Sequence, residues 1–166
     1  MNAILLLSSL ASAGKLADGF RGLAYGPASV VENAPLPQGC VTGGTPLDGE
    51  GERWVCAVEI NGIAVSASYM VDGGYFTGVY ISVPSNFAAA AAVYEALSAA
   101  YGTCRPKYAA DRSPFPECTW TDGTARAVWS YNQYSHKTTV TIFDMDVYAK
   151  VEAIRSERAR QAASGL

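Results

Sequence analysis

The stretch ERWVCAVEINGIAVSASYMVDGGYFTGVYISV, from Glu52 to Val83, decides the fold. It contains the β-rich runs ERWVCAVEI, IAVSASYMV and YFTGVYISV, which are enriched in branched and aromatic residues. Asn61-Gly62 separates the first two runs and Asp72-Gly73-Gly74 separates the last two, and such pairs favour tight hairpins. The stretch therefore predicts an antiparallel meander of strands.

The chain after this meander is predicted to form a helix, further strands and a second helix. PSNFAAAAAVYEALSAAYG (84–102) has apolar residues at helical spacing, with Ser85 as the expected cap and Gly102 as the expected stop. The runs CTWTDGTARAVWSYN and KTTVTIFDM are typical of strands. The amphipathic segment DVYAKVEAIRSERARQAASGL predicts a C-terminal helix.

The two halves of the chain share this order of elements. A shift of 62 residues places Cys56 on Cys118, Ser68-Tyr69 on Ser130-Tyr131 and Thr77 on Thr139. We therefore expect one α+β domain with an antiparallel sheet from two similar helix-loop-hairpin units, helices on one face and a C-terminal helix. The predicted boundaries are 14–166 for the domain, 20–84 and 85–145 for the half-repeats, and 146–163 for the helix.

Four cysteines enclose two polar loops, one in each half. Three pairings are possible, and we favour Cys40 with Cys56 and Cys104 with Cys118, because each pair flanks a turn-rich loop between neighbouring elements. An even number of cysteines is typical of proteins in an oxidising compartment. A zinc site is the alternative, but zinc sites normally use closely spaced cysteine pairs, so no metal or other cofactor is expected.

The amino-terminal segment MNAILLLSSLASA, residues 1–13, has an apolar run followed by the small residues Ala11-Ser12-Ala13. This pattern predicts a secretory signal peptide and hence a periplasmic or secreted protein. The alternative is an amino-terminal strand or helix that packs on the core.

The composition limits the classes of partner. Charged residues make up 16% of the chain, and 12 Lys and Arg oppose 15 Asp and Glu, so no broad basic surface is available for nucleic acid. No apolar run approaches the roughly 20 residues that a membrane-spanning helix needs. We expect a protein partner, no nucleic acid and no membrane span.

The sequence contains no recognisable catalytic constellation. His136 is the single histidine, and its neighbour Ser135 would point to the opposite face of a strand. Asp144 and Asp146 stand two residues apart before the last helix, where Asp146 is expected to act as the cap. We therefore predict a protein that is not an enzyme. The alternative is an enzyme whose cleft gathers His136, Asp144 and Asp146.

Aromatic residues supply the candidate binding surface. In YFTGVYISV, strict alternation directs Tyr75, Thr77, Val79, Ile81 and Val83 to the core, and Phe76 and Tyr80 to the other face. Trp129 and Tyr131 share a face in the second half, with Tyr134 in the turn beyond them. We expect an open sheet face whose binding residues are Phe76, Tyr80, Trp129, Tyr131 and Tyr134. The alternative is that these aromatics are a second layer of the core.

Short motifs resemble known exported proteins. In AYGPASVVENA, Ser29 and Glu32 have capping-box spacing and Pro35 follows, which predicts a helix of one or two turns. This segment precedes GCVTGGT and a second cysteine, and the order resembles the β-lactamase inhibitory protein family. FRGLAYG and YEALSAAYG are similar to segments of uncharacterised bacterial exported proteins, and the helix-then-sheet unit also resembles small outer-membrane-assembly lipoproteins. The resemblance implies a secreted protein-binding module that inhibits an exported hydrolase. The alternative is a structural subunit of an envelope or virion assembly.

Overall fold

The computed structural model describes residues 15–20, 24–27, 40–42, 52–72, 74–106, 117–132, 135 and 137–164. The predicted signal peptide, the short helix expected near Ser29, Tyr134 and His136 lie outside these residues. The described elements are a 3-10 turn, η2 (Leu16–Asp18), strands β1 (Gly26–Pro27), β2 (Cys40–Thr42), β3 (Glu52–Ile60), β4 (Ile63–Asp72) and β5 (Tyr75–Val83), helix α2 (Phe87–Tyr101), strands β6 (Arg105–Pro106), β7 (Cys118–Asp122), β8 (Ala125–Asn132) and β9 (Lys137–Asp144), and helix α3 (Met145–Ser164).

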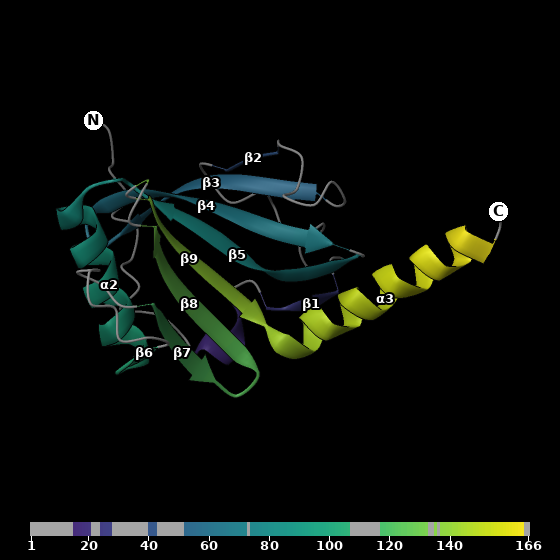
Figure 1. The fold of residues 1–166 in the computed structure, drawn as a ribbon. Coiled ribbons are helices and arrows are strands. Elements are labelled where there is room, and N and C mark those ends of the chain that lie inside the picture. The colour runs from purple at the N-terminus through teal and green to yellow at the C-terminus, as the bar shows by residue number, and fades with distance from the viewer. Residues whose placement is uncertain are drawn as a thin grey trace.

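The nine described strands form one antiparallel sheet, which confirms the predicted α+β class and the C-terminal helix. The strand order is β2-β3-β4-β5-β9-β8-β7-β6, so β5 and β9, the last strands of the two halves, meet in the middle (Figure 1). The short strand β1 pairs with the first residues of β5, beyond the point at which β9 ends. Apart from β1, the sheet therefore consists of two four-stranded meanders placed side by side.

Turn residues fix the hairpins where the sequence predicts them. Asn61 and Gly62 between β3 and β4 have φ of 49° and 77°, and Gly123 between β7 and β8 has φ of 60°. These left-handed conformations suit Asn and Gly and match the twist of two-residue hairpins. Equivalent strand ends in the two halves are 62 residues apart: Ile60 and Asp122, Ile63 and Ala125, Tyr75 and Lys137.

Both long helices begin at a residue other than the predicted cap. The Asn86 side chain, not that of Ser85, accepts a hydrogen bond from the Ala89 amide at 2.8 Å at the start of α2. Asp144, not Asp146, caps α3, because its Oδ1 accepts from the Asp146 and Val147 amides, each at 3.0 Å. In each helix the capping side chain belongs to the residue three positions before a bonded amide, which is the spacing at which a cap reaches that amide.

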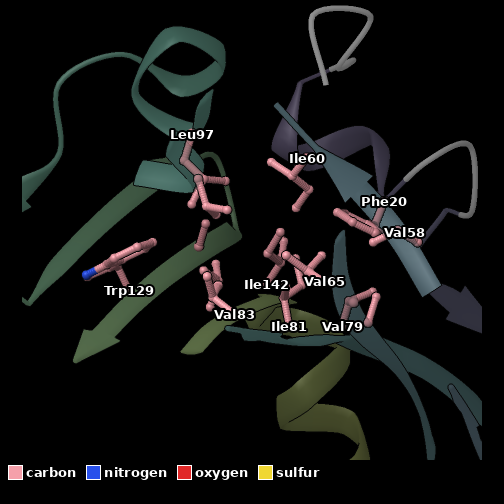
Figure 2. Close-up of a cluster of buried hydrophobic side chains, with 14 of the residues drawn as sticks. Phe20, Val58, Ile60, Val65, Val79, Ile81, Val83, Leu97, Trp129 and Ile142 are labelled. Atoms are coloured by element: carbon pink, nitrogen blue, oxygen red, sulfur yellow. The ribbon is translucent and has the colours of Figure 1, made fainter. Parts of the chain in front are cut away.

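The core lies between the sheet and α2. Val93 and Leu97 of α2 are fully buried, and Leu97 belongs to the same cluster of buried side chains as Val83 and Trp129 of the sheet (Figure 2). The amino-terminal segment adds Leu16 and Phe20 to this core, and the Phe20 ring contacts the Tyr69 ring at 5.9 Å. One face of the sheet is thus covered by α2 and the η2 segment.

α3 leaves the end of β9 and extends away from the sheet (Figure 1). Its first turns are anchored, because Val147 and Val151 are buried and Arg155 forms ion pairs with Asp72 at the end of β4 and with Glu152. All residues from 156 to 164 are exposed. The described helices include none with the length and apolar character that a bilayer crossing requires.

A β-bulge interrupts the alternation of β5. Met70 pairs with Gly78 and Val71 pairs with Phe76, so Thr77 has no partner opposite it on β4. The Thr77 hydroxyl donates to the Met70 carbonyl at 3.1 Å and satisfies the irregular backbone. The extra residue puts Phe76 on the same face as Val79, in the core, where strict alternation predicted the opposite face.

Disulfides join Cys40 to Cys56 and Cys104 to Cys118, as predicted. Cys40 and Cys56 are direct partners in the β2-β3 ladder, and the second bridge joins the chain just after α2 to β7. No described cysteine is free. The two bridges indicate an oxidising, extracytoplasmic environment.

Candidate functional site

Two of the predicted binding aromatics are core residues. Phe76 is fully buried and stacks between Tyr25 and Tyr69, with ring centroids at 5.6 and 5.9 Å. Trp129 is also fully buried, and its ring meets that of Tyr94 of α2 edge-on at 5.3 Å. The prediction that Phe76 and Trp129 belong to an exposed face is therefore wrong, because the bulge turns Phe76 inward and α2 covers Trp129.

The remaining predicted aromatics do not form one surface. Tyr131 alternates in step with Trp129 along β8 and lies on the covered side, where it is half-buried. Tyr80 pairs with Ser68 and Thr141 on the opposite side of the sheet and is half-buried there. Tyr134 lies outside the described residues. Of the predicted set, the structure places Tyr80 alone on the side of the sheet opposite α2.

The side of the sheet opposite α2, which we call the outer face, is organised in three rows of directly opposed residues. Opposed residues of adjacent strands share a face, so each row crosses the sheet as a line of neighbouring side chains. The central row is Val55, Ser68, Tyr80, Thr141, Val128 and Thr119; one flanking row is Ala57, Ser66, Ser82, Thr139 and Ser130; the other is Arg53, Met70, Gly78, Phe143, Arg126 and Thr121.

Small hydroxyl side chains surround a few apolar ones on this face. Tyr80, Val128 and Phe143 are half-buried, so their side chains are packed against neighbours and still reach solvent. Phe143 contacts Tyr148 of α3, with ring centroids at 6.2 Å, and Tyr148 is 47% exposed. Among the described residues, the outer face thus offers Tyr80 in its centre and Phe143 and Tyr148 where the sheet meets α3. Tyr75, which strict alternation predicted in the core, also lies on this side, because the bulge turns its neighbour Phe76 inward.

Sequence reasoning missed Phe143, Tyr148 and Val128. β9 alternates between buried Thr138, Val140 and Ile142 and the outer-face residues Thr139, Thr141 and Phe143. A phenylalanine at the end of a threonine-lined face is the signal that could have found Phe143, since a solvated strand face seldom carries a large apolar side chain.

The central row of the outer face contains no charged residue among those described. Charged residues lie to either side of it: Arg126 pairs with Phe143, Arg53 pairs with Met70, and Glu59 and Lys137 are exposed near the ends of β3 and β9 on the same side. An uncharged centre with a charged rim is typical of surfaces that bind by burial and hydrogen bonding at their centre.

The two perturbed tyrosines lie away from the outer face, in and around the covered core. Burial raises the pKa of Tyr25, with smaller contributions from Tyr101 and Asp144, and burial also raises the pKa of Tyr101. The Tyr25 hydroxyl is buried and makes no hydrogen bond within the described residues. Both phenols therefore stay protonated at neutral pH and cannot act as bases there.

The carboxylate pair considered for catalysis is engaged in structure. Asp144 Oδ2 accepts a hydrogen bond from the Thr124 hydroxyl at 2.6 Å, and Oδ1 caps α3, while Asp146 is exposed. His136 lies outside the described residues. Among the residues that the structure describes, no group of His, Cys, Asp or Glu side chains could hold a metal ion.

Comparison with known proteins does not assign the chain to a family. No model of a known protein family, no curated protein and no solved structure matches the chain. The functional argument therefore rests on the geometry and chemistry of the outer face.

Proposed function

We propose that this chain is a secreted or periplasmic, non-enzymatic module that binds a protein partner through the outer face. The observation that carries the proposal is the central row of directly opposed residues, in which Tyr80 stands between Ser68 and Thr141 in the middle of the sheet. Six adjacent strands contribute to this row, which at about 4.8 Å between strands spans about 24 Å. Small molecules are usually held in enclosed pockets, whereas a face this broad fits the surface of another protein.

Tyr80, Phe143 and Tyr148 are the proposed anchors. Aromatic side chains bury much area at low entropic cost, and binding energy concentrates in a few such residues. The exposed Ser66 and Ser82 and the half-buried Thr139 and Thr141 supply hydrogen-bond donors and acceptors around them, whereas Ser68 is buried. The resemblance of the sequence to the β-lactamase inhibitory protein family supports an exported hydrolase as the partner.

The test uses purified exported hydrolases, including a secreted β-lactamase, titrated with the wild-type protein in inhibition and calorimetric binding assays. For a hydrolase that binds, Tyr80→Ala and Phe143→Ala are expected to weaken binding by about 1 to 4 kcal/mol each. Phe87→Ala is the matched control, because Phe87 is 65% exposed but belongs to α2 rather than to the outer face. Unchanged affinity in both outer-face variants, or an equal loss in the control, would contradict the proposal.

A structural subunit of an envelope or virion assembly is the second candidate, and the projecting part of α3 favours it. Residues 156–164 are all exposed, and their helix is supported by its own contacts, such as the Glu157–Arg160 ion pair at 2.9 Å. Truncation after Arg155 is expected to abolish incorporation into such an assembly and to leave binding through the outer face intact. Incorporation that survives this truncation would contradict the assembly role.

A further inference from the structure

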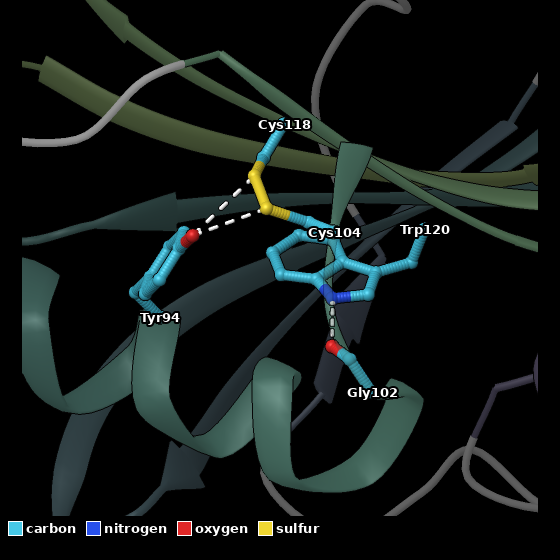
Figure 3. The surroundings of a disulfide bond; sticks show 5 residues. All are labelled: Tyr94, Gly102, Cys104, Cys118 and Trp120. Atoms are coloured by element: carbon cyan, nitrogen blue, oxygen red, sulfur yellow. Dashed lines mark hydrogen bonds between the residues drawn. A yellow bond between two sulfur atoms is a disulfide. The ribbon is translucent and has the colours of Figure 1, made fainter. Parts of the chain in front are cut away.

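The two disulfides have different chemical surroundings. In each bridge one cysteine is fully buried, Cys56 or Cys118, and the other, Cys40 or Cys104, is half-buried. Access to the sulfur atoms therefore does not distinguish the two bridges. What distinguishes them is a phenol, because the Tyr94 hydroxyl lies 3.1 Å from Cys104 Sγ and 3.4 Å from Cys118 Sγ (Figure 3). No such side-chain contact is recorded for Cys40–Cys56 within the described residues.

Tyr94 is held in this position by its neighbours. Its ring packs against Trp120 at 5.8 Å and against Trp129 at 5.3 Å, so the hydroxyl has little freedom to move away from the sulfurs. The Trp120 indole N–H donates to the Gly102 carbonyl at 2.8 Å, and this bond ties the end of α2 to β7 independently of the disulfide (Figure 3). Opening the disulfide would therefore leave α2 and β7 attached to each other.

We propose that Cys104–Cys118 is a redox-exchangeable clamp, whereas Cys40–Cys56 is a permanent structural bridge. A dithiol reductant attacks the half-buried Cys104 Sγ as its thiolate, a new sulfur–sulfur bond forms, and the Cys104–Cys118 bond breaks. Cys118 leaves with the electron pair as a thiolate, which the Tyr94 hydroxyl stabilises by donating a hydrogen bond. The second thiol of the reductant then displaces Cys104, so the reductant ends as a disulfide and the protein gains two electrons and two protons.

The physical basis is the dependence of exchange on the leaving group. A better stabilised leaving thiolate departs faster, and hydrogen bonds to charged groups are among the stronger ones in proteins. Reduction releases the chain between Cys104 and Cys118 from covalent closure, while the Trp120–Gly102 bond keeps the helix in place. The clamp is thus local, and the sheet and its outer face are expected to persist in both redox states.

The test follows both bridges in the same sample. The full-length oxidised protein is treated with dithiothreitol without denaturant, samples are quenched with acid and alkylated, and peptide mass spectrometry gives the fraction of each disulfide reduced with time. Cys104–Cys118 is expected to open first, and Tyr94→Phe to slow its reduction about 3- to 10-fold without changing the rate for Cys40–Cys56. Tyr101→Phe is the matched control, since it removes another phenol of α2 and should alter neither rate.

A second arm identifies the attacked sulfur without any substitution. Glutathione, a monothiol, should be trapped as an adduct on Cys104 and not on Cys118, because Cys118 is fully buried. Equal rates for the two bridges, earlier opening of Cys40–Cys56, an adduct on Cys118, or unchanged or faster reduction in Tyr94→Phe would each overturn the proposal. If global unfolding limited the rate of reduction, both bridges would open at the same rate, and this result would count against the proposal.

Discussion

The two halves of the sheet share a strand plan but fill the core with side chains of different size. Trp120 and Trp129 of the second half stand 62 positions after Val58 and Ala67 of the first, and all four are buried. Both tryptophan rings pack against Tyr94 of α2. The backbone plan therefore leaves the size of the core side chains open.

The two halves also differ by one inserted residue. Up to Phe76, most buried positions of the first half match buried positions of the second with a shift of 62, as Phe76 matches Thr138, while Ile60 and Tyr69 match the half-buried Asp122 and Tyr131. After the bulge the shift is 61, because buried Val79 and Ile81 match buried Val140 and Ile142. Thr77 is thus an extra residue in β5 that restores the core pattern one position later.

The largest expected effect of a substitution lies in the tryptophan-filled half. Trp129→Ala removes a fully buried ring and is expected to lower the free energy of unfolding by about 3 to 5 kcal/mol, because a cavity remains beneath α2. Val128→Ala, next to it on the outer face, is expected to cost about 1 kcal/mol or less. Urea unfolding measures both, and similar losses would show that the two faces are not divided as described.

An intermediate effect is expected at Gly78, which follows the bulge and pairs with Phe143 of β9. A Cβ at Gly78 would collide with the Ile142 carbonyl oxygen, so Gly78→Ala must displace the β9 backbone. The expected loss is about 1 to 3 kcal/mol, as for other overpacked sites. Thr139, the counterpart of Gly78 in the second half, provides the control, and Thr139→Ala should be nearly neutral. A neutral Gly78→Ala would refute the close approach of the two strands.

The smallest effect concerns the hydrogen bond inside the bulge. Thr77→Val keeps the shape of the side chain but removes the donor to the Met70 carbonyl, and the expected loss of stability is about 0.5 to 1.5 kcal/mol. Thr139→Val makes the same chemical change in β9 and should have little effect. Thermal unfolding of the two variants compares the loss of the bulge hydrogen bond with the same chemical change elsewhere in the sheet. Equal decreases in Tm would show that the hydrogen bond in the bulge adds no stability of its own.

Regular alternation and turn chemistry made most of the fold predictable. The runs 52–60 and 75–83 coincide with β3 and β5, and Asn61-Gly62 forms the predicted hairpin, because these signals are local. The disulfides were predictable for the same reason, since each joins elements that the chain already makes neighbours.

The candidate site was less predictable because it depends on which face each strand presents. The bulge at Thr77 lies in the pairing of β5 with β4. The glycine inside YFTGVYISV is a sequence signal of a bulge, but it does not show which neighbouring residue is the inserted one. One inserted residue exchanges the two faces, so Phe76 was assigned to the wrong side. The position of Tyr148 beside Phe143 depends on the direction in which α3 leaves β9, which is a tertiary property.

The projecting helix gives the molecule a lever. From Val151, its last fully buried residue, α3 continues to Ser164 over about 20 Å at 1.5 Å per residue. A tilt of about 10° at the base would move the tip by about 3 Å, because a helix transmits rotation along its length. Tyr148 lies at that base, so a partner that presses on it would shift the far end of α3, and a probe placed near Ser164 would register an event at the sheet.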